Sequence, residues 1–188
     1  MSISKNKISE LKEKFNCTVF FETGFYHGTR FDLALKCGFK KVVCIELLYD
    51  FVNNGKNKFK KEIQNNRAVI YHDDSANLSV YLDDVIDEKI LFWLDAHLDN
   101  GVEGAAVYPK SICPLIHEIE AMKKLNKPPV VLIDDIRCIV NGEWGQDKTK
   151  VNLGLVIEKL KEVSPDYKFE LIDGTIKDDI LLAFIEEI

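Results

Sequence analysis

Residues 18–29 read TVFFETGFYHGT, a short apolar run that leads into a turn with two glycines. The run Val19–Phe21 hardly alternates between apolar and polar positions, which is typical of a strand buried on both faces in a parallel sheet. Similar runs recur along the chain at 42–45, 68–71, 90–94 and 130–133. The sequence therefore predicts a largely parallel sheet of five such strands.

Helical spacing of apolar residues separates these runs. Three sets each share one helical face, namely Leu78, Leu82 and Val85; Leu115, Ile119 and Met122; and Val156, Leu160 and Val163. The segment 51–63 is a less regular helix, because Asn53, Asn54 and Gly55 interrupt its pattern. Strands that alternate with helices predict βαβ units with right-handed crossovers.

The last part of the chain departs from this alternation. Residues 167–172 and 180–185 are both strand-like and are separated by Asp173-Gly174 and a few polar residues, which predicts an antiparallel hairpin. The expected fold class is α/β, a doubly wound, mostly parallel Rossmann-like sheet with a C-terminal antiparallel hairpin. With 188 residues and a prior of ~150 per domain, we expect a single domain over 1–188.

Composition narrows the function classes. The 25 basic and 31 acidic residues give a formal net charge of −6, whereas nucleic-acid binders usually carry positive charge. No window approaches the roughly 18 apolar residues of a membrane span, and residues 1–15 lack the apolar region of a secretion signal. The five cysteines form no CxxC pair, which favours reduced thiols. We expect a cytoplasmic protein with no nucleic-acid partner and no membrane.

Acidic residues gather where the predicted parallel strands end. They are Glu22, Glu46, Asp95 and the pair Asp134-Asp135, and Asp73-Asp74 follow the third strand after His72. Ligands of open α/β sheets bind beyond these carboxyl ends. Like charges on one rim raise one another's pKa unless a cation or hydrogen-bond donors compensate them. The pattern predicts a binding site at this edge.

The glycine turn and Glu46 together indicate a nucleoside-containing cofactor. Gly24 and Gly28 permit a tight turn and let backbone N–H groups approach a ligand at the start of the next helix. The spacing is GxxxG, with Tyr26 at the position of a central glycine. Glu46 follows roughly 20 residues later, where a carboxylate can accept both ribose hydroxyls.

In order and spacing, Glu22-x-Gly24-x-x-x-Gly28, Glu46, Asp74-Ser75 and Asp95 resemble the cofactor motifs of class I S-adenosylmethionine-dependent methyltransferases. More narrowly, Trp93-Leu94-Asp95-Ala96-His97 followed by Leu132-Ile133-Asp134-Asp135 resembles the metal-dependent O-methyltransferases of the catechol and macrolide-sugar types. The chain lacks the middle glycine of the loop, and Asp135 stands where the catechol enzymes carry an asparagine.

The resemblance implies S-adenosylmethionine as cofactor. The loop from Gly24 would cradle the methionine part, Glu46 would take the ribose, and Asp74 and Ser75 would lie beside the adenine. The full expected cofactor-binding set is Glu22, Gly24, Tyr26, His27, Gly28, Glu46, Asp74, Ser75 and Asp95.

The resemblance further implies that Asp95, Asp134 and Asp135 hold a divalent ion. Neighbouring strands lie ~4.8 Å apart, so carboxylates at their ends converge, and an all-oxygen set suits Mg²⁺ or Mn²⁺. In the alternative interpretation, these acids only cap loops. Asp95 and His97 are the expected catalytic residues, with His97 as general base or fourth ligand, or in a plainer role orienting a carboxylate.

The leading hypothesis is a metal-assisted O-methyltransferase acting on a hydroxyl of a sugar or small secondary metabolite. Only ~16 residues precede the first strand, enough for one short helix, so the acceptor site is expected to be open or completed by a partner subunit in a homodimer; this favours a glycan acceptor. The stretch 98–112 would cover the substrate, and Tyr108 and Trp144 would be aromatic walls.

Two alternatives stay open. A non-catalytic nucleoside-binding module would keep the fold without the chemistry. A nicotinamide-dependent oxidoreductase is disfavoured, because none of the six tyrosines has a lysine four residues later.

Overall fold

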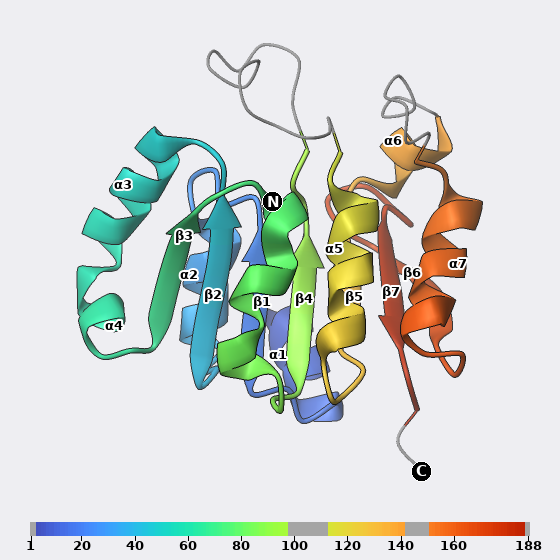
Figure 1. The fold of residues 1–188 in the computed structure, drawn as a ribbon, viewed down its shortest axis with the longest axis horizontal. Helices are drawn as coiled ribbons and strands as arrows, with labels where there is room; N and C mark the ends of the chain where they lie inside the picture. Colours follow the sequence, from blue (N-terminus) through green and yellow to red (C-terminus); the bar gives the residue numbers. More distant parts are fainter. Residues whose placement is uncertain (1–2, 98–112, 142–150, 187–188) are drawn as a thin grey trace.

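The computed structural model describes residues 3–97, 113–141 and 151–186. Its centre is a seven-stranded sheet in the order β3-β2-β1-β4-β5-β7-β6 (Figure 1). The strands are β1 Val19–Thr23, β2 Lys41–Glu46, β3 Ala68–His72, β4 Ile90–Leu94, β5 Val130–Ile133, β6 Lys168–Ile172 and β7 Ile180–Phe184. Strands β1 to β5 pair in parallel, whereas β7 is antiparallel to both β5 and β6. The predicted parallel sheet with a C-terminal hairpin is confirmed.

The register brings the carboxyl ends of the parallel strands to one edge. Thr23 pairs with Leu94, and Leu94 pairs with Ile133, so the chain leaves β1, β4 and β5 at one level. From β1 the chain proceeds outward to β2 and β3 and then returns to β4 on the other side of β1. This reversal beside β1 is the point where open α/β sheets bind their ligands.

Helices cover both faces of the sheet (Figure 1). One face packs against α1 (Lys5–Lys14), α2 (Thr29–Lys36) and α3 (Tyr49–Lys58), through buried residues such as Ile8, Phe31 and Val52. The other face packs against the 3₁₀ helix η1 (Ser75–Tyr81), α5 (Leu115–Ala121) and α7 (Leu153–Val163). The remaining elements are α4 Lys60–Gln64, η2 Asp83–Val85, η4 Met122–Lys124 and α6 Ile136–Val140.

Two helical segments differ in detail from the pattern in the sequence. Residues 75–85 bury Leu78, Leu82 and Val85 as expected, but they do so from 3₁₀ turns. The Ser, Asn and Val residues of this segment are weak α-helix formers, which explains the tighter and shorter turns. Helix α3 runs through Gly55 without a break. Packing explains the glycine, because a Cβ at this position would come within 2.6 Å of the Phe25 ring.

None of the helices in the described ranges has both the length and the apolar character that a membrane span requires.

Candidate cofactor and metal site

The glycine loop starts where the backbone passes very close to the ends of two neighbouring strands. Gly24 has φ +81°, and its N–H donates to the carbonyl of Ile45 at the end of β2. A Cβ at Gly24 would lie 2.7 Å from the backbone oxygen of Asp95. Both the positive φ and this close approach require glycine, so the loop lies directly against the end of β4.

In the middle of the loop, Phe25 packs into the core while Tyr26 is exposed to solvent. Phe25 is buried, and its ring would clash with any Cβ at Gly28, whose φ is +67°. Tyr26 occupies the central position with φ +49° and is 56% exposed. Its ring and that of His27 both contact Phe51 on α3, with centroid distances of 5.1 and 5.5 Å. The loop thus presents an aromatic rim in place of a central glycine.

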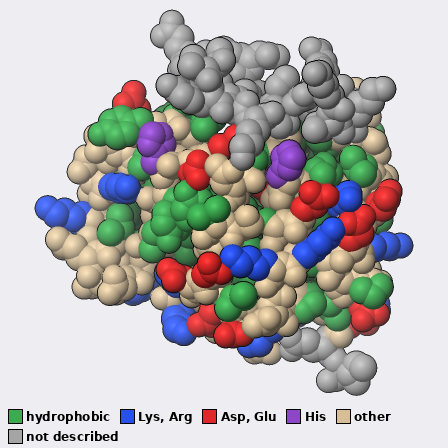
Figure 2. All heavy atoms as spheres, in the orientation of Figure 1, with side chains coloured by type: hydrophobic (Ala, Val, Ile, Leu, Met, Phe, Trp, Pro, Cys, Tyr) green, Lys and Arg blue, Asp and Glu red, His purple; other side chains and the backbone are tan. Residues whose placement is uncertain are grey.

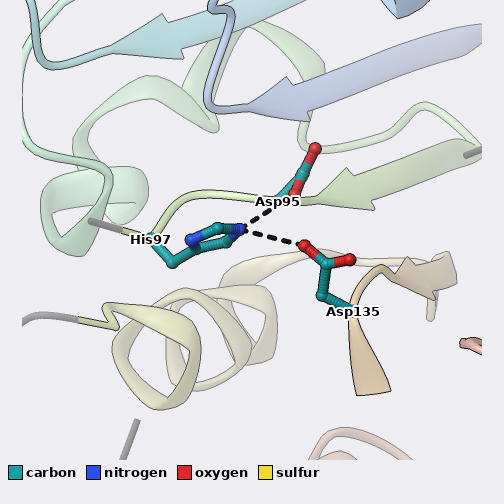
Figure 3. A group of neighbouring side chains, drawn as sticks. All are labelled: Asp95, His97 and Asp135. Atoms are coloured by element: carbon teal, nitrogen blue, oxygen red, sulfur yellow. Dashed lines mark hydrogen bonds and ion pairs between the residues drawn. The ribbon is translucent and has the colours of Figure 1, made fainter. Parts of the chain in front are cut away.

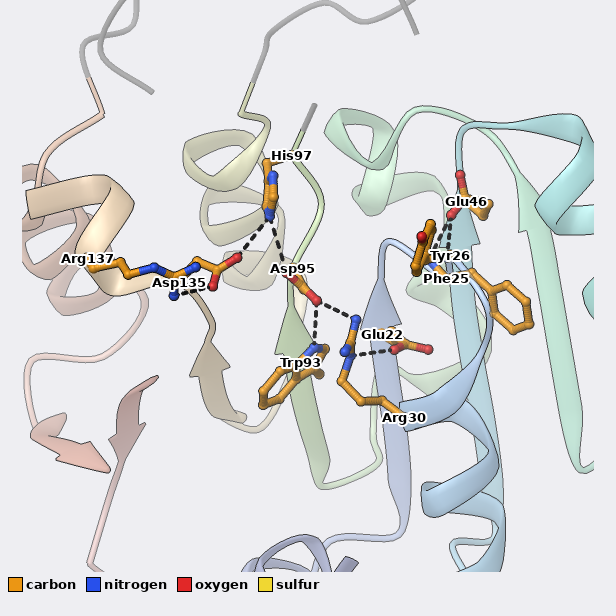
Figure 4. Close-up of polar contacts among 10 residues, drawn as sticks. All are labelled: Glu22, Phe25, Tyr26, Arg30, Glu46, Trp93, Asp95, His97, Asp135 and Arg137. Atoms are coloured by element: carbon orange, nitrogen blue, oxygen red, sulfur yellow. Dashed lines mark hydrogen bonds and ion pairs between the residues drawn. The ribbon is translucent and has the colours of Figure 1, made fainter. Parts of the chain in front are cut away.

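Glu46 ties this loop to the end of β2. Its Oε2 accepts hydrogen bonds from the backbone N–H groups of Phe25 at 2.8 Å and Tyr26 at 3.0 Å (Figure 4). Its Oε1 accepts one from the N–H of Leu48 at 2.7 Å. A carboxylate oxygen can accept two hydrogen bonds, so Oε1 keeps capacity for a ligand hydroxyl.

Asp74 and Ser75, the residues predicted to lie beside the adenine, form the start of η1, which follows β3. Asp74 caps η1, since its Oδ1 accepts the N–H of Ala76 at 2.9 Å, and Ser75 is buried beneath it. Loop residue His27 and strand-end residue His72 are both exposed, and His72 Nε2 lies 3.0 Å from the carbonyl of Leu47.

Asp95, His97 and Asp135 form an acidic centre across the ends of β4 and β5 (Figure 3). The imidazole Nε2 of His97 lies 3.1 Å from Asp135 Oδ2 and 3.5 Å from Asp95 Oδ1. One donor atom from each side chain falls within 4.8 Å of the others. The hydrogen bond with His97, helped by Arg137, holds the pKa of Asp135 below its usual range.

Asp134 lies beside this centre. It is 3% exposed and forms a second group with Asp135 and Asp179, within the same 4.8 Å limit. The three predicted metal carboxylates therefore divide between two adjoining groups that share Asp135. The residue that joins Asp95 and Asp135 is His97.

Asp135 has an unusual backbone conformation, and Arg137 contacts its side chain. Its φ is +55°, a conformation that Asp tolerates better than most residues. Its Oδ1 accepts a hydrogen bond from Arg137 at 2.6 Å, and the Arg137 guanidinium also pairs with Asp179. Asp179 in turn accepts the backbone N–H of Arg137 at 2.9 Å. The sequence analysis did not identify Asp179 and Arg137, because no sequence pattern connects the start of β7 with α6, which lies about 40 residues earlier.

Arg30 contacts two of the predicted acids, Asp95 and Glu22, and lies on the side of Asp95 that faces away from His97 (Figure 4). Its Nη2 lies 2.5 Å from Asp95 Oδ2, and its Nε lies 3.3 Å from Glu22 Oε1. Burial raises the pKa of Glu22 to about 8, although the nearby Arg30 charge opposes that shift. Within the described residues, the other oxygen of Glu22 has no hydrogen-bond partner. The sequence analysis did not predict a role for Arg30. A basic residue two positions after Gly28, next to an edge of the sheet rich in acids, was the signal that could have identified it.

Glu118 is a second residue that the sequence interpretation missed. It is 1% exposed on α5 and lines a small cavity with Leu94, Asp95, Ala96, His97, Cys113, Leu115, Ile133 and Asp134. Burial raises the pKa of Glu118 to about 7, and the negative charges of Asp74 and Asp95 act in the same direction. Its place three residues after Leu115, on the apolar face of the helix, could have identified it.

The predicted covering stretch 98–112, with Tyr108, and Trp144 lie outside the described residues.

The chain matches no family model and no curated protein sequence. The solved structures that it resembles include an O-methyltransferase of Bacillus cereus in complex with S-adenosylhomocysteine, at TM-score 0.62 and 12% identity over 98% of this chain and 82% of that one. The fold is that of the class I methyltransferases.

Two further structures show how widely this methyltransferase fold is used. TomG of Streptomyces achromogenes, an O-methyltransferase involved in tomaymycin synthesis and solved with S-adenosylmethionine, has TM-score 0.61 and 13% identity over 99% of this chain and 82% of its own. A Clostridium thermocellum protein described as an rRNA methylase has TM-score 0.61 and 16% identity over 97% of this chain and 98% of its own. The class I methyltransferase fold thus leaves the acceptor open.

Proposed function

We propose that this chain is an S-adenosylmethionine-dependent O-methyltransferase that uses a divalent ion and acts on a hydroxyl of a sugar or small secondary metabolite. One observation carries the proposal. The Glu46-tethered glycine loop and the centre of Asp95, His97 and Asp135 lie at the same carboxyl edge, and Asp95 contacts both.

The residues of the loop fit the cofactor. Glu46 Oε1 has acceptor capacity left for a ribose hydroxyl, and the buried Oε2 of Glu22 is unpartnered within the described residues. We assign the loop from Gly24 to Gly28 to the methionine part, and Asp74 and Ser75 to the adenine side. An edge rich in carboxylates also favours a cofactor whose sulfonium carries positive charge.

The acidic centre fits a divalent ion with an altered ligand set. We assign Asp95, His97 and Asp135 as ligands, because their donor atoms converge, and place Asp134 behind them. Two carboxylates and one imidazole depart from the all-oxygen sets of Mg²⁺ and favour Mn²⁺ or another first-row dication. When bound, such an ion lowers the pKa of an acceptor hydroxyl and orients it.

The chain's own residues would prepare this reaction by holding the partners in place. The acceptor O–H loses its proton, the oxygen gains the methyl group, and the cofactor leaves as S-adenosylhomocysteine. The Nε2 atom of His97 faces Asp95 and Asp135, so this nitrogen does not face an acceptor hydroxyl as a general base would. We therefore assign His97 to the ion, so the acceptor proton leaves by another group or by water.

A small acceptor fits the surface better than RNA does. The described part of the face in Figure 2 shows acidic and basic side chains side by side, whereas proteins that bind nucleic acid usually gather Lys and Arg in a basic patch or stripe.

The proposal is tested in two stages. Calorimetry should show binding of S-adenosylhomocysteine to the wild type and weaker binding to Glu46→Ala, with exposed Glu158→Ala as the control. Incubation with S-adenosylmethionine, Mn²⁺ and panels of sugars, phenols and RNA should then show a mass increase of one methylene group on a hydroxyl compound. Cofactor binding with transfer only to RNA would overturn the acceptor class, and no binding would overturn the whole proposal.

A further inference from the structure

Arg30 is placed to control the orientation of Asp95. It is the second residue of α2, directly after the glycine loop, and its side chain is only 16% exposed. Nη2 contacts Asp95 Oδ2 at 2.5 Å, and Nε contacts Glu22 Oε1 at 3.3 Å. A planar guanidinium can hold two carboxylates in one fixed arrangement, which a lysine ammonium cannot do.

Trp93 supplies a second hydrogen-bond donor to the same oxygen of Asp95. The indole Nε1 lies 3.4 Å from Asp95 Oδ2, and the guanidinium of Arg30 lies over the indole ring at 5.4 Å. Two donors therefore face Oδ2. The other oxygen, Oδ1, faces Nε2 of His97 at 3.5 Å. Figure 4 shows the two oxygens of Asp95 facing opposite sides, one toward Arg30 and one toward His97.

We propose that Arg30 is a positioning residue that immobilises Asp95 through Oδ2 and so presents Oδ1 to the metal ion held with His97 and Asp135. This inference rests on the proposed function, because it requires the ion. Arg30 would act through Asp95 and would not touch the ion or the acceptor.

The direction of the effect separates positioning from simple charge. A nearby cation repels a dication, so an Arg30 acting only by its charge would weaken Mn²⁺ binding, and its removal would tighten it. If Arg30 positions Asp95, its removal frees the carboxylate to rotate and weakens Mn²⁺ binding. Groups that orient metal ligands are typically worth roughly 10–100-fold in metal affinity.

The test compares Arg30→Gln and Arg30→Lys with Lys36→Gln, an exposed residue of the same helix. Mn²⁺ affinity is measured by electron paramagnetic resonance, and S-adenosylhomocysteine affinity by calorimetry. We expect Arg30→Gln to bind Mn²⁺ roughly 10–100-fold more weakly. Arg30→Lys should recover part of that loss, and all variants should keep wild-type affinity for S-adenosylhomocysteine.

Three results would overturn the inference. One is unchanged or tighter Mn²⁺ binding by Arg30→Gln. Another is a loss of S-adenosylhomocysteine affinity without loss of affinity for 5′-methylthioadenosine, which would assign Arg30 to the methionine carboxylate. The third is a wild type that binds no Mn²⁺, which would also remove the metal from the proposed function, whereas the first two leave that function intact.

A variant that keeps the ion pairs provides a second route if Arg30→Gln does not fold. Trp93→Phe removes the indole N–H near Asp95 and keeps an aromatic ring beneath the guanidinium. We expect it to weaken Mn²⁺ binding by a smaller factor than Arg30→Gln and to spare S-adenosylhomocysteine binding. Wild-type Mn²⁺ affinity in both Trp93→Phe and Arg30→Lys would contradict the inference.

Discussion

The imidazole Nε2 of His97 lies 3.1 Å from Oδ2 of Asp135, although the two residues are 38 positions apart in the chain. The parallel pairing of Leu94 with Ile133 brings the ends of β4 and β5 together, and each residue follows its strand within three positions. The contact makes one centre from two strand ends, and the metal proposal depends on it.

Replacing His97 by alanine should weaken Mn²⁺ binding and leave S-adenosylhomocysteine binding unchanged, because the imidazole supplies one of three converging donors. We expect a loss of at least roughly 10–100-fold, which is typical even of groups that only support a ligand. Electron paramagnetic resonance titration measures it. His117→Ala, at an exposed position of α5, is the matched control. Equal Mn²⁺ affinity in both variants would remove His97 from the metal centre.

Gly24→Ala should destabilise the protein more than Gly38→Ala. Both glycines have positive φ, +81° and +75°, so each substitution costs roughly 1–2 kcal/mol of conformational strain. Only at Gly24 would the new Cβ meet another atom, Asp95 O at 2.7 Å, while Gly38 has nothing within 4 Å. Such overpacking adds about 1–3 kcal/mol. Urea denaturation measures both variants, and equal losses would show that the loop does not press on β4.

Glu46→Ala should lower both stability and cofactor affinity. The substitution leaves the N–H groups of Phe25, Tyr26 and Leu48 without their acceptor, and hydrogen bonds to a charged group contribute about 1.5–3 kcal/mol. We expect a loss of unfolding free energy of at least this size, together with weaker binding of S-adenosylhomocysteine. Glu158→Ala should change neither quantity. Normal cofactor affinity in a destabilised Glu46→Ala would reduce Glu46 to a structural role.

Glu118→Gln should change how stability depends on pH. Because the folded-state pKa of Glu118 is raised to about 7, the folded protein keeps a proton that the unfolded chain releases from its usual value near 4.5 upward. Wild-type stability from this group is therefore full below pH 4.5 and declines as pH rises toward 7. Relative to wild type, Glu118→Gln should gain stability between pH 5 and pH 8. Denaturant titrations at both pH values measure the difference, and an equal difference at both would refute the assignment.

Much of the fold was predictable because parallel strands have a distinct sequence pattern. The apolar runs 90–94 and 130–133 are buried on both faces, and the hairpin at the end follows from its turn. Residues 75–85 were harder, because a periodic apolar spacing gives burial but does not separate 3₁₀ turns from an α-helix.

The candidate site was predictable where an acid marks the end of a strand or a pair of glycines marks a turn. Glu22, Glu46, Asp95 and Asp135 were found for that reason. Arg30 and Arg137 were not, because each contacts an acid that lies far away in the sequence, Asp95 for Arg30 and Asp179 for Arg137. Side-chain direction also decides whether Asp134 or His97 joins Asp95 and Asp135, and strand-end position alone does not determine it.

The most direct test of the account is a crystal of the wild type grown with S-adenosylhomocysteine and Mn²⁺, analysed by anomalous diffraction. We expect one strong manganese peak among Asp95, His97 and Asp135, with the ribose of the bound nucleoside at Glu46. A nucleoside bound elsewhere, or a manganese peak away from these three side chains, would contradict the claim that the two sites share one edge of the sheet.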